Sequence, residues 1–198
     1  VHAMGGEQAP ANLDDLIRLR VAAMPTAERA VLEMLAVAGQ PLERNVLNAT
    51  IGEEIGNAVL ALRSENMIRS RVLADSTSAH EALDASHDRF REAVLASMTD
   101  VDRRARHLRL AVALEDLDRG DPEILAAHYA AAGEPLRAAE HAVAAAANAS
   151  EALAFDHAAR LYGFALELHP SISNADELRV QLADALTRAG RGFEAAPI

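Results

Sequence analysis

Apolar residues recur at spacings of three and four along the first 64 residues, the pattern of helices with one buried face. The pattern breaks at residues that end helices, namely Pro25, the segment 39–41 and Gly52. Asn12 and Thr26 precede two of the apolar stripes and are candidate N-caps. We therefore expect four helices: one over 12–24, one over 26–38, one that runs through Leu42, Val46 and Leu47 before Gly52, and one over 53–64.

The pattern changes after Asn66. Residues 67–73 predict a short strand, a polar loop follows at 75–78, and a return strand is expected near 80–86. Another helix is predicted from Asp88 to Met98. Helices followed by a small hairpin and a closing helix are the order of a winged-helix domain, which we expect over 12–99.

Beyond Thr99 the pattern is entirely helical, in pieces of about 12 to 18 residues. Small and large residues alternate over 158–168 and Pro170 follows, as in the second helix of a tetratricopeptide repeat, and 182–195 resembles the next repeat. We therefore expect a tetratricopeptide-like array over 100–198. An ordinary alanine-rich bundle would produce some of the same matches. The expected breaks between its helices lie at 120–122, 133–135, 149–150 and 169–170.

Composition supports a mainly helical fold and narrows the function. Of the 198 residues, 51% are hydrophobic but only 3% are aromatic, which favours close-packed helices over a sandwich or barrel. A net charge of -11 argues against nucleic acid as the partner of the whole chain. Cysteine is absent, and we see neither a signal peptide nor an apolar stretch of membrane-spanning length. We expect a cytoplasmic protein with no membrane partner.

Both ends of the sequence indicate a fragment. The chain does not begin with Met, and residues 1–11 lack apolar periodicity, so we expect a linker or an added end there. At the other end a helix opens near Gly192 and the sequence stops a few residues later. We expect the helical array to be truncated at this end.

His87-Asp88 stands immediately before an amphipathic helix and is the main candidate site. An aspartate at a helix start can cap free N–H groups, and the same helix end attracts an anion. A histidine beside it could donate to a phosphate and would titrate near neutral pH. The alternative is that Asp88 is only a cap and His87 only a surface or packed histidine.

Enzyme motifs are absent or geometrically unsuitable. The chain has no G-x-x-x-x-G-K-[ST] loop and no lysine, so it is not itself an ATPase of that class. Ser86-His87-Asp88 contains the residue types of a hydrolase triad, but consecutive side chains diverge. His80 and Asp84 lie near this motif without a metal-ligand spacing, and we expect a solvated loop. Three further histidines lie on successive predicted helices and could form a stack, although partly exposed positions are the simpler reading: His128, His141 and His157.

A winged helix also raises the possibility of DNA binding. The helix that would enter a major groove carries Glu53 and Glu54, which repel phosphates, and Arg63 as its only base. The predicted wing carries Arg69 and Arg71, which could contact a DNA backbone. We expect the arginine-rich run over 103–109 to be a solvated helix face, and the alanine run over 142–149 to pack against another helix.

The order of these pieces resembles a known family. Quoted along the chain, they are Asn12-Leu13-Asp14-Asp15-Leu16, the helix over 31–39, the wing, the motif over 86–94, and repeats starting near His128-Tyr129. This order is similar to the region after the nucleotide-binding domain in signal-transduction ATPases with numerous domains. That group includes the maltose-type and large LuxR-type regulators and ATPase modules of bacterial kinases and cyclases. The resemblance covers nearly the whole chain.

The resemblance implies a role for the His-Asp motif. In this family the winged helix folds onto the ATPase, and a histidine at such a motif senses the phosphate of bound ADP. Carried over, His87 would be the sensor and Asp88 its helix-starting neighbour. Ser86 departs from the apolar residue often found there, and Arg89-Phe90 replaces an aliphatic pair. The fragment itself would hold no cofactor, and ATP or ADP would bind in the full-length protein.

The expected function is therefore regulatory and non-catalytic. The helical array would bind a protein, a peptide or a small effector, and the winged helix would couple that binding to an ATPase domain upstream in the same polypeptide. The alternative is a DNA-binding winged-helix transcription regulator that uses Arg69 and Arg71.

Overall fold

The computed structural model describes residues 13–52, 55–74 and 79–195. As predicted, the chain is mainly helical, and the described residues contain one small antiparallel sheet. The chain divides into two compact units, 1–106 and 107–198, with the division inside helix α6 (Asp100–Asp116). The boundary expected from the sequence lay at residue 99. No described helix combines the length and the apolarity needed to cross a membrane.

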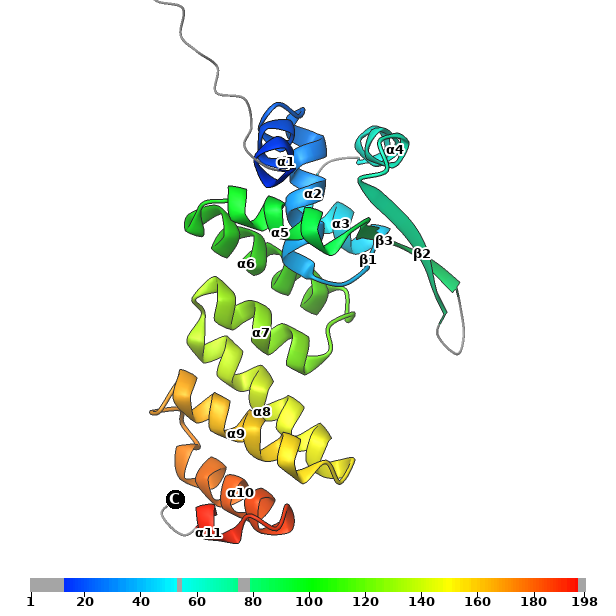
Figure 1. Ribbon diagram of the computed structural model, residues 1–198. Coiled ribbons are helices and arrows are strands. Elements are labelled where there is room, and N and C mark those ends of the chain that lie inside the picture. Colours follow the sequence, from blue (N-terminus) through cyan, green and yellow to red (C-terminus); the bar gives the residue numbers. More distant parts are fainter. Residues whose placement is uncertain (1–12, 53–54, 75–78, 196–198) are drawn as a thin grey trace, which may run out of the picture. The chain divides into compact units, whose positions relative to one another are not determined.

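The first unit carries helices around a three-stranded sheet (Figure 1). Its elements in chain order, before α6, are α1 (Leu13–Ala22), α2 (Thr26–Ala38), β1 (Leu42–Glu43), α3 (Arg44–Ile51), α4 (Gly56–Ser64), β2 (Ile68–Ala74), β3 (Ala79–Ala85) and α5 (Asp88–Ser97). The two expected strands and the closing helix are present within one residue of the predicted places, and the expected loop over 75–78 lies outside the described residues. Of the two expected caps, Asn12 lies outside the described residues, and Thr26 is the first residue of α2 rather than its N-cap.

The sheet order is β1-β3-β2, with both pairings antiparallel. The prediction of a helix starting at Leu42 was wrong, because Leu42 pairs with Leu83 of the central strand and α3 begins only at Arg44. Helix α2 packs against α3, α4, α5 and β3, and its side chains from Ala30 to Ala38, apart from Glu33, are buried. This helix is therefore the centre of the unit's core.

In the second unit the helices from α7 to α11 pack on their neighbours along the chain (Figure 1). After α6 the helices are α7 (Pro122–Ala132), α8 (Pro135–Glu151), α9 (Phe155–Leu168), α10 (Ala175–Arg188) and the short α11 (Gly192–Ala195). The break expected at 149–150 was wrong, because α8 continues to Glu151 and the chain turns through Leu153 at positive φ.

Alanine forms much of the core of the second unit. Ala142, Ala145, Ala146 and Ala149 of α8 are buried, and most of α8's contacts are with α7 and α9. A methyl side chain lets two helix backbones approach closely, so the alanine run packs helices as expected.

Candidate functional site

His87 and Asp88 lie where β3 ends and α5 begins. His87 is the N-cap residue of α5 with extended backbone (φ -144°, ψ 140°), and its ring makes no capping hydrogen bond. Asp88 is the first helical residue, so its charge lies near the positive end of the helix dipole without the capping role expected for it. Both side chains are exposed.

A pocket of about 470 Å³ adjoins His87. Ile17, Met67 and Phe90 supply apolar surface, and the remaining lining residues are polar or charged: Glu65, Asn66, Ser86, His87 and Arg89. Glu65, which accepts a hydrogen bond from Arg20 at 2.9 Å, places a carboxylate at the pocket edge. An anion here would meet His87 and Arg89 but also this carboxylate, so the phosphate-sensor role of His87 stays a prediction.

Both arginines of the predicted wing form ion pairs. Arg69 Nη2 lies 3.0 Å, and Arg71 Nε 3.3 Å, from the same carboxylate oxygen of Asp84 across the hairpin. This arrangement follows from the register, in which Arg69 is directly opposite Asp84 and the alternation of side chains along β2 puts Arg71 on the same face. A DNA phosphate would have to compete with Asp84 for both cations.

A second carboxylate offsets further arginines of the first unit. Glu81 forms ion pairs with Arg44 and Arg63 and accepts a hydrogen bond from Ser70 Oγ at 2.9 Å. The Ser70 hydrogen bond and the two guanidinium groups lower the pKa of Glu81, although partial burial opposes them. Arg63, the basic residue of the helix that would enter a DNA major groove, therefore already forms an ion pair. Glu53 and Glu54 lie outside the described residues.

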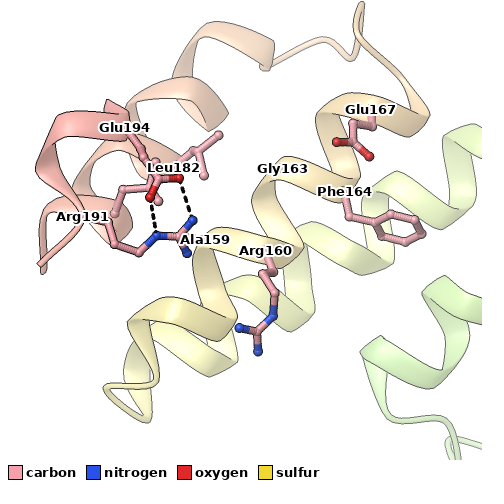
Figure 2. Close-up of a pocket in the computed structure, with 9 residues that line it drawn as sticks. Ala159, Arg160, Gly163, Phe164, Glu167, Leu182, Arg191 and Glu194 are labelled. Carbon is pink, nitrogen blue, oxygen red and sulfur yellow. Dashed lines mark hydrogen bonds and ion pairs between the residues drawn. The ribbon is translucent and has the colours of Figure 1, made fainter. Parts of the chain in front are cut away.

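The helical array carries a groove of about 420 Å³ lined by α9, α10 and the segment around α11 (Figure 2). Along α9 the lining residues run in the order Arg160, Gly163, Phe164 and Glu167. Leu182 and Leu186 of α10 add apolar surface. A Cβ added at Gly163 would meet no atom within 4 Å, so the groove is open at this point.

Two charges of the α9 wall lack an oppositely charged partner among the residues that the structure describes. Arg160 donates to His157 Nδ1 at 3.1 Å, and the other nitrogen of that ring bonds Glu123 at 2.7 Å. His157 therefore lies between Arg160 and Glu123 in this chain of hydrogen bonds. Within residues 13–52, 55–74 and 79–195, Glu167 makes no ion pair, and both it and Arg160 are exposed.

The opposite wall of the groove is internally paired. Arg191 donates to both oxygens of Glu194 at 2.7 Å, and Figure 2 shows these two side chains facing each other. Arg191 also reaches Asp156 at 3.3 Å. Hydrogen bonding to Arg191 lowers the pKa of Glu194, and the two carboxylates raise the pKa of Arg191. The charge pattern that a ligand meets is therefore set mainly by Arg160 and Glu167.

A polar cluster joins α6, α7 and α8, and the sequence analysis did not identify it. The hydroxyl of the fully buried Tyr129 donates to Glu115 at 2.6 Å, and Arg137 also donates to this carboxylate. The guanidinium carbon of Arg137 lies 4.2 Å from the centre of the Tyr129 ring, and His141 stacks on the same ring at 5.3 Å. The Tyr129 hydrogen bond lowers the pKa of Glu115, whereas burial raises that of Tyr129. These contacts tie three helices together.

His107 and His128 form a second polar contact between α6 and α7. Their Nδ1 atoms are 2.9 Å apart, so one ring donates and the other accepts. Burial, with a smaller contribution from His107, lowers the pKa of His128 to about 4. His128 was expected to be partly exposed, but it is buried. It bonds His107 and not the other two histidines of the proposed stack, since His141 contacts Tyr129 and His157 contacts Glu123.

The described residues contain no group of three or more side chains placed to hold a metal ion, and the segment around His80 and Asp84 is no exception. In the arginine-rich run of α6, Arg106 bonds Glu33 of α2 at 2.8 Å, and both side chains are at most 20% exposed. Arg106 is therefore mostly buried, whereas a solvated helix face was expected for this run. Its partner is 73 positions away, which a local pattern does not reveal.

The comparisons with known proteins identify no relative. No family model matches the chain, and neither the curated proteins nor the solved structures contain a match to it.

Proposed function

We propose that this chain is a regulatory, partner-binding part of a larger signal-transduction ATPase or transcription regulator. The observation that carries the proposal is the groove over α9, where Arg160 and Glu167 are exposed beside the open position at Gly163. Charges without an oppositely charged partner among the described residues, next to accessible apolar surface, are what a binding site offers to a partner.

We also propose a specific fold class for each of the two units. We assign the first unit to the winged-helix class, a reading supported by the order helix, strand, two helices and hairpin from α2 to β3, and by the sheet order β1-β3-β2. We assign the second unit to tetratricopeptide-like repeats, supported by the packing of consecutive helices from α7 to α11. We further propose that the protein acts in the cytoplasm.

The role we propose is binding rather than catalysis. The polar cluster around Tyr129 and Glu115 is tuned away from proton transfer, because the tyrosine pKa is raised and the carboxylate pKa is lowered. A general acid or base works best with a pKa near the working pH. Its hydrogen bonds join helices, which is a structural use.

We propose further that partner binding is coupled to ATP or ADP in an ATPase domain of the same polypeptide, with His87 as the phosphate-sensing residue. This part is supported by the resemblance of the motifs and by the pocket beside His87. DNA binding through Arg69 and Arg71 is less favoured, because Asp84 pairs with both of them.

The coupling is tested first by reading the coding sequence upstream of residue 1. We expect a phosphate-binding loop with its lysine within a domain length or two, on the order of 150 to 300 residues. In that longer protein His87→Ala should weaken ADP binding, whereas Ser97→Ala, at the other end of α5, should not. An upstream stop codon, or unchanged ADP affinity in His87→Ala, would refute the coupling.

A further inference from the structure

The α9 wall of the groove has a regular spacing. Arg160, Gly163, Phe164 and Glu167 follow one another at i, i+3, i+4 and i+7, so they lie on one face of the helix. With a rise of 1.5 Å per residue, the two charged positions are separated by about 10.5 Å along the axis. A cation and an anion thus flank a short apolar stretch.

The middle of this face allows close approach. Gly163 has no side chain, and the space above it is open. Phe164 is half-buried on the adjacent position, and Leu182 lies across the groove on α10. A partner could therefore bring apolar side chains close to the α9 backbone between the two charges.

We propose that the groove binds an amphipathic helix of a partner protein that carries an acidic and a basic residue seven positions apart, with apolar residues between them. The acidic residue pairs with Arg160 and the basic residue with Glu167. This inference rests on the proposed partner-binding function and specifies the chemistry of the partner.

A helical ligand fits because it repeats the spacing of the groove. Residues i and i+7 of a helix share a face and are also about 10.5 Å apart. In a β-strand, residues on the same face are about 6.6 or 13 Å apart, so a strand matches the spacing of the two charges less closely than a helix does. The apolar residues at i+3 and i+4 of the ligand would lie over Gly163 and Phe164, as in other helix-in-groove complexes.

The test uses the chain with fluorescein-labelled synthetic helical peptides rich in alanine. Each peptide carries leucine at i+3 and i+4, and the charged positions i and i+7 are Glu and Lys, two Glu, or two Lys. We expect fluorescence anisotropy to show the mixed peptide binding about tenfold more tightly than either uniform peptide, since each uniform peptide turns one attraction into a repulsion. The Arg160→Glu variant should instead prefer the peptide with two Lys by about tenfold, since an attraction replaces a repulsion.

Control variants separate the groove from general charge effects. Arg104→Glu makes the same change of net charge at an exposed site on α6, outside the groove, and should keep the preference for the mixed peptide. Gly163→Trp should abolish binding by filling the groove, and Gly163→Ala should retain it. Circular dichroism of each variant checks that it is folded.

Several results would overturn the inference. These are equal binding of all three helical peptides, no binding of any of them, or tighter binding of a proline-rich extended peptide with its charges three positions apart. Such results would leave the proposed coupling to an ATPase standing, because that proposal is tested separately through the upstream sequence and His87.

Discussion

Acidification from pH 7.5 to pH 5 should destabilise the second unit through His128. Burial lowers the pKa of this histidine from 6.5 to about 4. A base with a lower pKa in the folded state binds its proton more weakly there than in the unfolded chain. Its contribution to stability is therefore complete above pH 6.5 and is lost as the pH falls toward 4.

The size of the effect follows from the two pKa values. A difference between 6.5 and about 4 corresponds to about 3.4 kcal/mol at 1.36 kcal/mol per pKa unit, once His128 is protonated in both states. At pH 5 the unfolded histidine is almost fully protonated and the folded one only about one-tenth, so about 2 kcal/mol is lost. That loss is a sizeable fraction of the 5 to 15 kcal/mol by which domains are usually stable.

Tyrosine fluorescence provides a selective assay. The chain has two tyrosines and no tryptophan, and Tyr129 and Tyr162 both belong to the second unit. Urea unfolding followed by this signal at pH 7.5 and at pH 5 therefore measures the stability of that unit. The pKa values of Glu115 and Glu194 are lowered below the ordinary 4.5, so the contributions of these carboxylates to stability are lost mainly below pH 4.5, outside the range of this assay.

Two variants identify the responsible group. In His128→Phe the difference in unfolding free energy between the two pH values should shrink by about 2 kcal/mol, because the buried titrating group is gone. His87→Gln removes an exposed histidine of the first unit and should leave the difference unchanged. An equal difference in the parent and in His128→Phe would refute the reasoning.

Three further predictions concern stability and charge. Urea unfolding should show that Gly163→Ala stabilises the second unit by about 1 kcal/mol, because alanine has the higher helix propensity. Gly120→Ala should destabilise the same unit, because the new Cβ would lie 2.7 Å from the Leu125 side chain. A change of the same sign in both variants would contradict this prediction. Tyr129→Phe should cost about 1 kcal/mol in the same assay, the net value of its hydrogen bond to α6, and an unchanged midpoint would show that the bond contributes nothing. Asp84→Asn should release the two hairpin arginines and raise the salt concentration that elutes the chain from heparin, and unchanged elution would show that the ion pairs do not mask them.

Local patterns predicted most elements because helix and hairpin signals are short-range. The hairpin over 68–85 and the start of α5 at Asp88 follow from alternation, a polar loop and a helical stripe. Strand β1 was missed, because it has only two residues and exists through the pairing of Leu42 with Leu83, 41 positions away. A strand of this kind has no periodicity of its own.

In the candidate sites, too, local features were predictable from the sequence and contacts between distant residues were not. The position of His87 at a helix start was predicted, but its neighbours from α1 and from the turn before β2 were not, since they come from distant parts of the chain. The stripe from Arg160 to Glu167 was visible in the sequence as part of a helix. Its exposure on a groove depends on where α10 and α11 pack.

The sequence by itself determined the helical character, the places of most helix ends and the hairpin, because spacing, glycine, proline and the alanine content act within a few residues. Tertiary structure decided which charges are used. Asp84 and Glu81 pair with arginines of the first unit, whereas Arg160 and Glu167 lack such partners within the described chain. A charged side chain forms an ion pair when an opposite charge lies within about 4 Å of it. For residues far apart in the sequence, the tertiary packing determines whether the two side chains come that close.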